Sequence, residues 1–441
     1  MKQKILTLAC AFAATAAAQT GGGGGYLGPG VLSRGAGDIG RRSGQEVDLR
    51  FFASAYAIYD TGIQPFSLDS SGKLLETNGL FGVEGELGVY GTHDWKRASL
   101  GLDYRGNYRH YNDSTFYNGS DHSLMLGYSF RRSRRFAVDM RQVAGTSSRG
   151  LGGFTSIVPG DLVNQPTSLL FDNQTYYSQS SMSFNYIQSA RTIFTAGGDG
   201  FLVRRQSKAL IGMNGFSLYG AVQHRQTKNT TVGVTYKYMH YDYPRAFGEA
   251  DVNVAQLTYS TVLGRRWTFS LAGGVARSEV RGIQQVAVDP VIAALTGQAA
   301  VIRTFYRLNT LPSLEATLTG KFKHTQLVLN YSRGVNAGNG LYLTSRSESA
   351  GGILSYTAIR RVALSMSGGY GTLGGLSQGL SNYRQFNAGA SASYALGRSM
   401  HVTGRYESRH TELESYLYNR FGYRATFGLT FSPGTLPVSF W

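Results

Sequence analysis

The chain has 441 residues and a formal charge of +17, with 43 Lys and Arg against 26 Asp and Glu. It contains a single cysteine, Cys10, so a disulfide-stapled fold and a multi-cysteine metal site are excluded. A hydrophobic content of 42% is too high for a chain that is disordered throughout. The surplus of glycine (58) and tyrosine (29), with only 9 prolines, favours a protein built from many strands.

Residues 1–18 have the three parts of an export signal. Lys2 and Lys4 form a basic front, an apolar stretch follows, and three alanines before Gln19 provide a small-residue cleavage site. Residues 19–45 are dominated by glycine and have no apolar period, so we expect a flexible periplasmic tether. No later apolar run reaches the roughly 18 residues that a membrane helix needs.

From residue 46 to residue 431 apolar residues recur at every second position, which is the period of a β-strand with different surroundings on its two faces. In one such run Phe81, Val83 and Leu87 oppose Glu84 and Glu86. Short connections rich in basic residues alternate with longer polar ones. The runs predict 18 strands, or 16 because two segments near residues 191–225 alternate poorly.

Strands of this length and number predict a membrane barrel rather than a soluble sheet. A soluble sheet of long hairpins would leave strand edges to cover, whereas a closed barrel satisfies every backbone N–H and C=O in hydrocarbon. We therefore expect an all-β fold, a transmembrane antiparallel up-and-down β-barrel over residues 46–431. An even strand number places both termini on the short-turn, periplasmic side, and residues 432–441 form a C-terminal extension.

The last predicted strand alternates toward a final aromatic residue, with Tyr423, Ala425, Phe427, Leu429 and Phe431 on one face. This pattern resembles the terminal-strand signature of Gram-negative outer-membrane β-barrels, and the whole of residues 46–431 is similar to β-barrel porins, some of them associated with exopolysaccharide genes. The resemblance implies a Gram-negative outer-membrane location, contact with outer-membrane lipid, and engagement by the barrel-assembly machinery. It implies an assembly signal at Tyr423, Phe427, Leu429 and Phe431, although the signature usually ends the chain and Trp441 is a second terminal aromatic.

A barrel of this size is too wide for side chains to fill, so its interior is expected to hold water. The polar face places more bases than acids toward the lumen and its mouths, and rings of Arg and Lys favour anions. The alternative is that these charges form salt bridges that stiffen the wall. The bases are Arg50, Arg105, Arg109, Arg131, Arg141, Lys237, Arg405, Arg409 and Arg424, and the acids are Glu84, Glu86, Asp103, Asp139, Glu315 and Glu407.

Two long connections are candidates for narrowing the pore. Residues 147–173 show little alternation and either fold into the lumen or form a solvated surface loop. Residues 282–302 are expected to form a second long loop. Within it, the alanine-rich stretch 286–300 predicts a short helix at 291–295 that would occlude the mouth.

The sequence offers no positive evidence for catalysis, a cofactor or a metal site. Residues 375–379 match G-x-S-x-G, but they fall in a glycine-rich loop, whereas a nucleophile elbow needs a preceding strand and a following helix. His110 and His122 flank one loop with Asp113 and Asp121, which is more typical of solvated loop residues than of a metal site. The basic residues are spread over turns and lumen, so nucleic acid is not an expected partner.

Three functions are compatible with these observations. The first is a porin-like channel for passive diffusion of hydrophilic solutes, with a leaning toward anions. The second is an export pore for an acidic exopolysaccharide, resembling alginate-export porins, whose lumens are also lined by arginine. The third is a structural or adhesion barrel that is closed by its loops. Conductance in planar bilayers separates the three.

Overall fold

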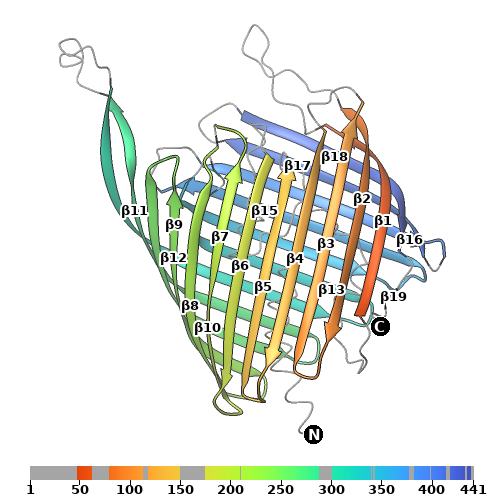
Figure 1. Ribbon diagram of the computed structural model, residues 1–441, viewed down its shortest axis with the longest axis horizontal. Coiled ribbons are helices and arrows are strands. Elements are labelled where there is room, and N and C mark those ends of the chain that lie inside the picture. Colours follow the sequence, from red (N-terminus) through yellow and green to blue (C-terminus); the bar gives the residue numbers. More distant parts are fainter. Residues whose placement is uncertain are drawn as a thin grey trace.

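The computed structural model is a closed antiparallel β-barrel (Figure 1). It describes residues 47–61, 79–112, 118–148, 174–208, 210–287, 300–338, 340, 343–376, 382–397, 399–413, 418–432 and 435–438. The first nine strands are β1 (Val47–Asp60), β2 (Leu80–Asp94), β3 (Ala98–Tyr111), β4 (Gly119–Arg131), β5 (Phe136–Ser148), β6 (Gln174–Ile187), β7 (Thr192–Arg205), β8 (Met213–Arg225) and β9 (Thr230–Tyr243). The others are β10 (Gly248–Leu263), β11 (Trp267–Ala287), β12 (Ala300–Lys321), β13 (Thr325–Asn336), β14 (Ser345–Tyr356), β15 (Val362–Gly375), β16 (Tyr383–Ala395), β17 (Met400–Leu413), β18 (Tyr418–Phe431) and the short β19 (Thr435–Val438).

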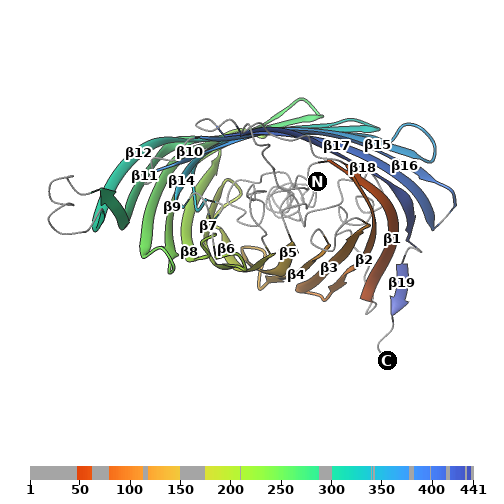
Figure 2. The same ribbon diagram turned by 90° about the horizontal axis from the view of Figure 1, so that it is seen from above.

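Each of the strands β1 to β18 pairs with its neighbours in sequence, and β18 pairs back with β1 to close the barrel. The predicted up-and-down barrel of 18 strands is therefore confirmed, and the poorly alternating segments form separate strands, β7 and β8. The strands are joined by short turns at one end and by longer connections at the other (Figure 1). Viewed from above, the barrel has an oval cross-section (Figure 2).

The long connection expected at residues 282–302 is shorter than the sequence analysis predicts. Residues 282–287 and 300–302 belong to β11 and β12, because the pairing of these two strands continues up to Ala287 and Ala300. The helix expected at 291–295 lies outside the described residues, as do residues 149–173 of the other candidate loop and the predicted signal and tether, residues 1–45.

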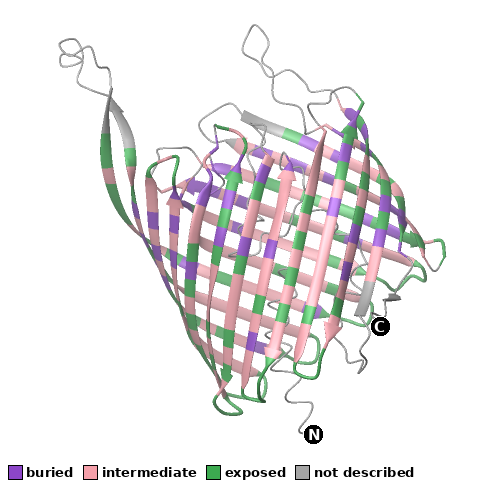
Figure 3. Cartoon of the chain, in the orientation of Figure 1, coloured by how far each residue is buried: buried purple, intermediate pink, exposed green. Residues whose placement is uncertain are grey.

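The exterior of the barrel is apolar. Leu257 is 70% exposed, Phe427 is 65% exposed and Phe81 is 64% exposed, and exposed positions alternate with more buried ones along the strands (Figure 3). Large apolar side chains at such exposure around a whole barrel are stabilised by lipid rather than by water. Further predicted lipid-facing residues with exposed side chains are Val83, Leu87, Leu124, Leu126, Tyr128, Val234, Tyr236, Phe386, Leu429 and Phe431. No helix in the described part of the chain is long and apolar enough to cross a membrane.

The seam between the first and last strands is tightly packed. β18 pairs with β1 from Ala53↔Phe431 to Asp60↔Arg424, and β19 continues along β1 from Val47 to Arg50. Ser54 donates a hydrogen bond to Thr430 (Oγ–Oγ1 3.0 Å) on the inner face of this seam. Gly428 has no room for a side chain, because a Cβ there would lie 1.9 Å from the carbonyl oxygen of Ala55. The C-terminal extension therefore contributes backbone pairing to β1, beyond the predicted terminal strand.

Candidate pore lining

Charged side chains gather on the inner faces of β1 to β4 and of β17 and β18, and we name this region the charged wall. Arg424 of β18 forms an ion pair with Glu84 of β2 across the intervening strand β1. Side chains converge on the concave side of a curved sheet, so a contact that skips one strand places both residues inside the barrel. Further pairs join Arg405 to Glu407, Arg409 to Glu407 (Nη2–Oε2 3.7 Å), Arg105 to Asp103 (Nη2–Oδ2 2.9 Å) and Arg109 to Asp121 (Nη2–Oδ2 2.7 Å).

The strand register explains this convergence. Arg424 lies directly opposite Glu407 on one side and opposite Asp60 on the other. Glu84 lies opposite Arg109 on β3. Oppositely charged residues at facing positions of neighbouring strands stabilise an antiparallel pair, so each base in this row is placed beside an acid by the backbone itself.

Several groups of the charged wall are buried. Arg109 is 1% exposed, Glu407 is 4% exposed and Arg424 is 6% exposed. A buried charge is very unfavourable unless it is paired and hydrogen-bonded. Arg109 is paired through its Nη2 atom, which contacts Asp121 and the carbonyl and hydroxyl oxygens of Ser148 (3.4 and 3.3 Å). The wall therefore contains the salt bridges that the sequence analysis considered as the alternative to anion selectivity.

The other predicted lumen residues share the inner face of the sheet. Glu86 of β2 belongs to the charged wall, and the others lie at other places around the barrel. Arg50 is opposite Tyr90 at the short-turn end of β1, and Arg131 is exposed at the end of β4. Glu86 is opposite Ser54 on β1. The remaining four lie on three other strands: Asp139 and Arg141 on β5, Lys237 on β9 and Glu315 on β12.

Sequence reasoning missed two acids of the charged wall. Asp60 is the last inward-facing residue of β1. It follows Ser54 and Ile58 on the same face at even-numbered positions, and this alternation could have identified it. Asp121 was predicted to be a solvated loop residue. In the structure it accepts hydrogen bonds from Ser148 N (2.6 Å) and Ser148 Oγ (3.1 Å) as well as from Arg109. Among the described residues no cluster of His, Cys, Asp and Glu suits a metal ion.

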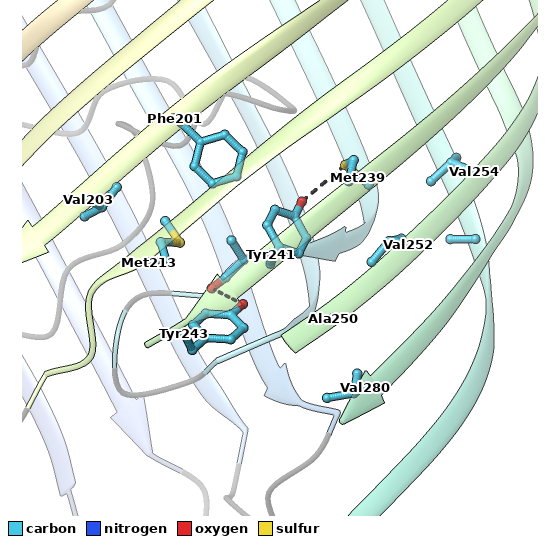
Figure 4. Packing of buried hydrophobic residues seen from close by; sticks show 12 residues of the cluster. Phe201, Val203, Met213, Met239, Tyr241, Tyr243, Ala250, Val252, Val254 and Val280 are labelled. Carbon is cyan, nitrogen blue, oxygen red and sulfur yellow. Dashed lines mark hydrogen bonds between the residues drawn. The ribbon is translucent and has the colours of Figure 1, made fainter. Parts of the chain in front are cut away.

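A second part of the inner surface is apolar. Inward-facing residues of β7 to β11 form a buried cluster toward the long-connection end (Figure 4). An apolar patch inside a water-filled barrel is unfavourable unless something covers it. The cluster consists of Phe201, Val203, Met213, Met239, Tyr241, Tyr243, Ala250, Val252, Val254, Ala276, Val280 and Ala337.

The last member of this cluster, Ala337, comes from the connection between β13 and β14. We name the described residues of this connection, Ala337, Gly338, Gly340, Leu343 and Thr344, the strap. The hydroxyl of Tyr243 on β9 donates to the carbonyl oxygen of Ala337 (3.0 Å) and lies 3.1 Å from Oγ1 of Thr344. Ile211 N donates to the carbonyl oxygen of Gly340 (3.0 Å). Because β9 lies four strands from β13, the strap turns inward and packs on the inner face of β7 to β9.

Two glycines allow the strap to take this path. Gly338 and Gly340 have φ values of 72° and 92°, which side chains other than glycine rarely adopt. A Cβ at Gly340 would also lie 2.5 Å from Nε of Arg205. Residues 147–173 were expected to fold inward or to form a surface loop, and residues 286–300 were expected to occlude the mouth. The signal for the strap is the apolar inner face of β9 and β10.

Replacing Tyr243 by phenylalanine is expected to loosen the strap. The change leaves the buried carbonyl of Ala337 without its donor, at a cost of about 1–3 kcal/mol for an unsatisfied buried group. We expect a larger single-channel conductance with more open-state noise in planar bilayers. The matched control is Tyr241→Phe, since the Tyr241 hydroxyl donates only within β9, to the sulfur of Met239 (3.2 Å). An equal change in both variants would show that the strap does not narrow the pore.

Several solved structures are similar to this chain over most of its length. OccK2 (OpdF) of Pseudomonas aeruginosa is 11% identical over 88% of this chain and 98% of that chain, with a TM-score of 0.42. A BenF-like porin from Pseudomonas fluorescens Pf-5 is 9% identical over 88% and 98%, with a TM-score of 0.43. The outer membrane protein opdK of Pseudomonas aeruginosa is 9% identical over 87% and 98%, with a TM-score of 0.40.

No protein-family model matches the sequence, and no curated protein matches it either. Two of these solved structures are described as a BenF-like porin and as an outer membrane protein. The barrel fold itself follows from the strand pairing of this chain, from β1 through β18 and back to β1.

Proposed function

We propose that the chain is a passive outer-membrane channel through which small hydrophilic solutes diffuse past the charged wall. The observation that carries this proposal is the set of ion pairs that join Arg424 to Glu84 and Arg409 to Glu407 on the inside of a barrel whose outside is apolar. Charged side chains at membrane depth are stable when they face a water-filled cavity or each other. A polar interior within an apolar exterior is the arrangement of a diffusion pore.

The proposed orientation places the short turns and both termini in the periplasm and the long connections outside the cell. The start of β1 and the end of β18 lie at the short-turn end, which supports this arrangement. In this orientation the terminal strand, with Phe427, Leu429 and Phe431 facing lipid, would present the assembly signal to the barrel-assembly machinery from the periplasmic side.

We further propose a weak preference for anions, set by two residues outside the charged wall. In the wall itself the bases are matched by acids. Arg141 on β5 and Lys237 on β9 share the inner face, are half-buried, and have no acidic partner among the described residues. Uncompensated cations in a lumen attract anions and donate hydrogen bonds to them.

Reversal potentials across planar bilayers under a salt gradient test this proposal. We expect discrete open steps with a small anion preference, and Arg141→Gln combined with Lys237→Gln should move the reversal potential toward zero. Arg277→Gln is the matched control, because Arg277 lies on the outer face beside Glu279 (Nη2–Oε1 3.0 Å). An absence of steps under all conditions would contradict the channel, and block by polyuronate at low concentration would favour the export pore.

A further inference from the structure

The hairpin of β11 and β12 extends beyond the rest of the barrel and has an open edge. β11 has 21 residues and β12 has 22, and their outer part rises above the neighbouring strands (Figure 1). β12 pairs with β13 only from Leu314↔Arg333 to Lys321↔Gln326. Within the described part of the chain, residues 300–313 of β12 therefore pair with β11 alone.

The direction of the free backbone groups follows from the ladder. Lys321 N donates to Arg266 O on the β11 side, whereas Phe322 N donates to Thr325 O on the β13 side. Because the register is continuous from residue 300 to residue 321, the N–H and C=O groups of even-numbered residues point to the β13 side. From residue 302 to residue 312 no described strand pairs with β12 on the β13 side, and this side is the open edge.

Pro312 supports this assignment. It lies inside a long strand, opposite Val275, where proline would remove a ladder hydrogen bond if both sides were paired. Pro312 is even-numbered and lies beyond the last pair with β13, so its missing N–H faces the open edge. The other even positions, up to Ile302, still present a donor and an acceptor each. Such a row is a template for an added strand.

The two faces of this edge differ in chemistry. Tyr306 and Leu308 project to the outer side and are 56% and 50% exposed. Arg303 and Arg307 project to the other side and are exposed, and Arg307 Nη1 is 3.5 Å from the carbonyl oxygen of Leu376. Neither arginine has an acidic partner among the described residues. A strand added here would place alternate side chains beside the apolar pair and beside the two arginines.

We infer that the edge of β12 from residue 302 to residue 311 binds an extended partner segment in which acidic and apolar residues alternate. Main-chain hydrogen bonds supply the attachment, and the alternating side chains supply the selection. A second copy of this edge is disfavoured, because it would bring Arg303 and Arg307 against like charges. The inference rests on the proposed insertion in a membrane, which leaves the long-connection end in water, and not on transport.

The test uses a labelled peptide of about twelve residues with alternating Glu and Val, and fluorescence anisotropy with the full chain in detergent micelles. Thr304→Pro combined with Thr310→Pro removes two edge donors at even positions, as Pro312 already does, and should weaken binding about tenfold. The matched control, Thr304→Ala with Thr310→Ala, keeps both donors and should bind normally. Arg303→Gln combined with Arg307→Gln removes the two positive charges of the edge and should also weaken binding of the peptide. This variant provides the test if the proline variant does not fold.

Several results would overturn the inference. They are an absence of binding, unchanged binding by both the proline and the glutamine variants, equal binding of a Lys–Val peptide, and displacement of the peptide by vesicles that carry phosphorylated lipid. Bilayer conductance and peptide binding of the unmodified chain separate this inference from the channel proposal. Normal conductance with no peptide binding refutes the edge alone, whereas peptide binding by a chain that never conducts refutes the channel alone.

Discussion

Replacing Leu257 by arginine is expected to destabilise the barrel by about 2–4 kcal/mol, the cost of a cation on the lipid face near the bilayer midplane. Leu257 lies near the middle of β10, is 70% exposed, and is opposite Val234 on β9, which is exposed as well. A guanidinium at this position would meet acyl chains instead of water. The measurement is reversible urea or guanidinium unfolding of the barrel in phospholipid vesicles.

The control for this experiment is the next residue along the strand. Thr258 has its side chain on the inner face of the barrel and is half-buried. Thr258→Arg adds the same charge to the same strand, so we expect a change within about 0.5 kcal/mol, as for a substitution at a hydrated surface. If Thr258→Arg destabilised the barrel as much as Leu257→Arg, the inner face would not be in water. The assignment of a lipid-facing outer side and a hydrated inner side to each strand would then be wrong.

The faces of the strands could be predicted from the sequence because they depend only on local geometry. Successive side chains of a strand point to opposite sides, so Leu257 and Thr258 are assigned once the strand is recognised. An up-and-down barrel also pairs each strand with its sequence neighbours, so a correct strand count is sufficient to predict the order. For these reasons the barrel and its outward-facing residues could be predicted, whereas the strand number was predicted only as 18 or 16.

The pairs of the charged wall could not be predicted in the same way. Arg424 and Glu84 are far apart in the sequence, and they meet only because β18 closes on β1 with one register. That register depends on the stagger of all strands around the barrel. The sequence analysis placed both residues in the lumen, but whether they act as free charges or as an ion pair depends on this stagger.

The strap was missed because length and composition do not reveal which connection folds inward. Residues 147–173 were chosen for their length, whereas the strap is short and follows β13 directly. The strap packs against the apolar inner face of β9 and β10, which includes Met239, Tyr241 and Val252. A lumen that is filled with water is expected to carry polar residues at such positions. Two apolar faces on one strand indicate a buried inner surface, and this signal is present in the sequence.

Replacing Arg424 by methionine is expected to destabilise the barrel by about 3–5 kcal/mol, the cost of leaving a buried charge without its partner. The side chains of Glu84 and Glu407 are 12% and 5% exposed, so neither carboxylate can recover full hydration when the guanidinium is lost. Methionine keeps the length and apolar volume of the arginine stem, so the lost packing is small. Unfolding in vesicles measures the change.

Two comparisons decide whether burial is the cause. Arg424→Met combined with Glu84→Gln removes both charges of one pair, so we expect it to recover part of the lost stability. Arg281→Met also breaks an ion pair between an arginine and a glutamate, with Glu249 (Nη1–Oε1 3.0 Å). There both side chains are exposed, so a loss of less than about 1 kcal/mol is expected. Equal losses for Arg424→Met and Arg281→Met would mean that bulk water reaches Arg424, and the charged wall would then line an open lumen with its charges free to select solutes.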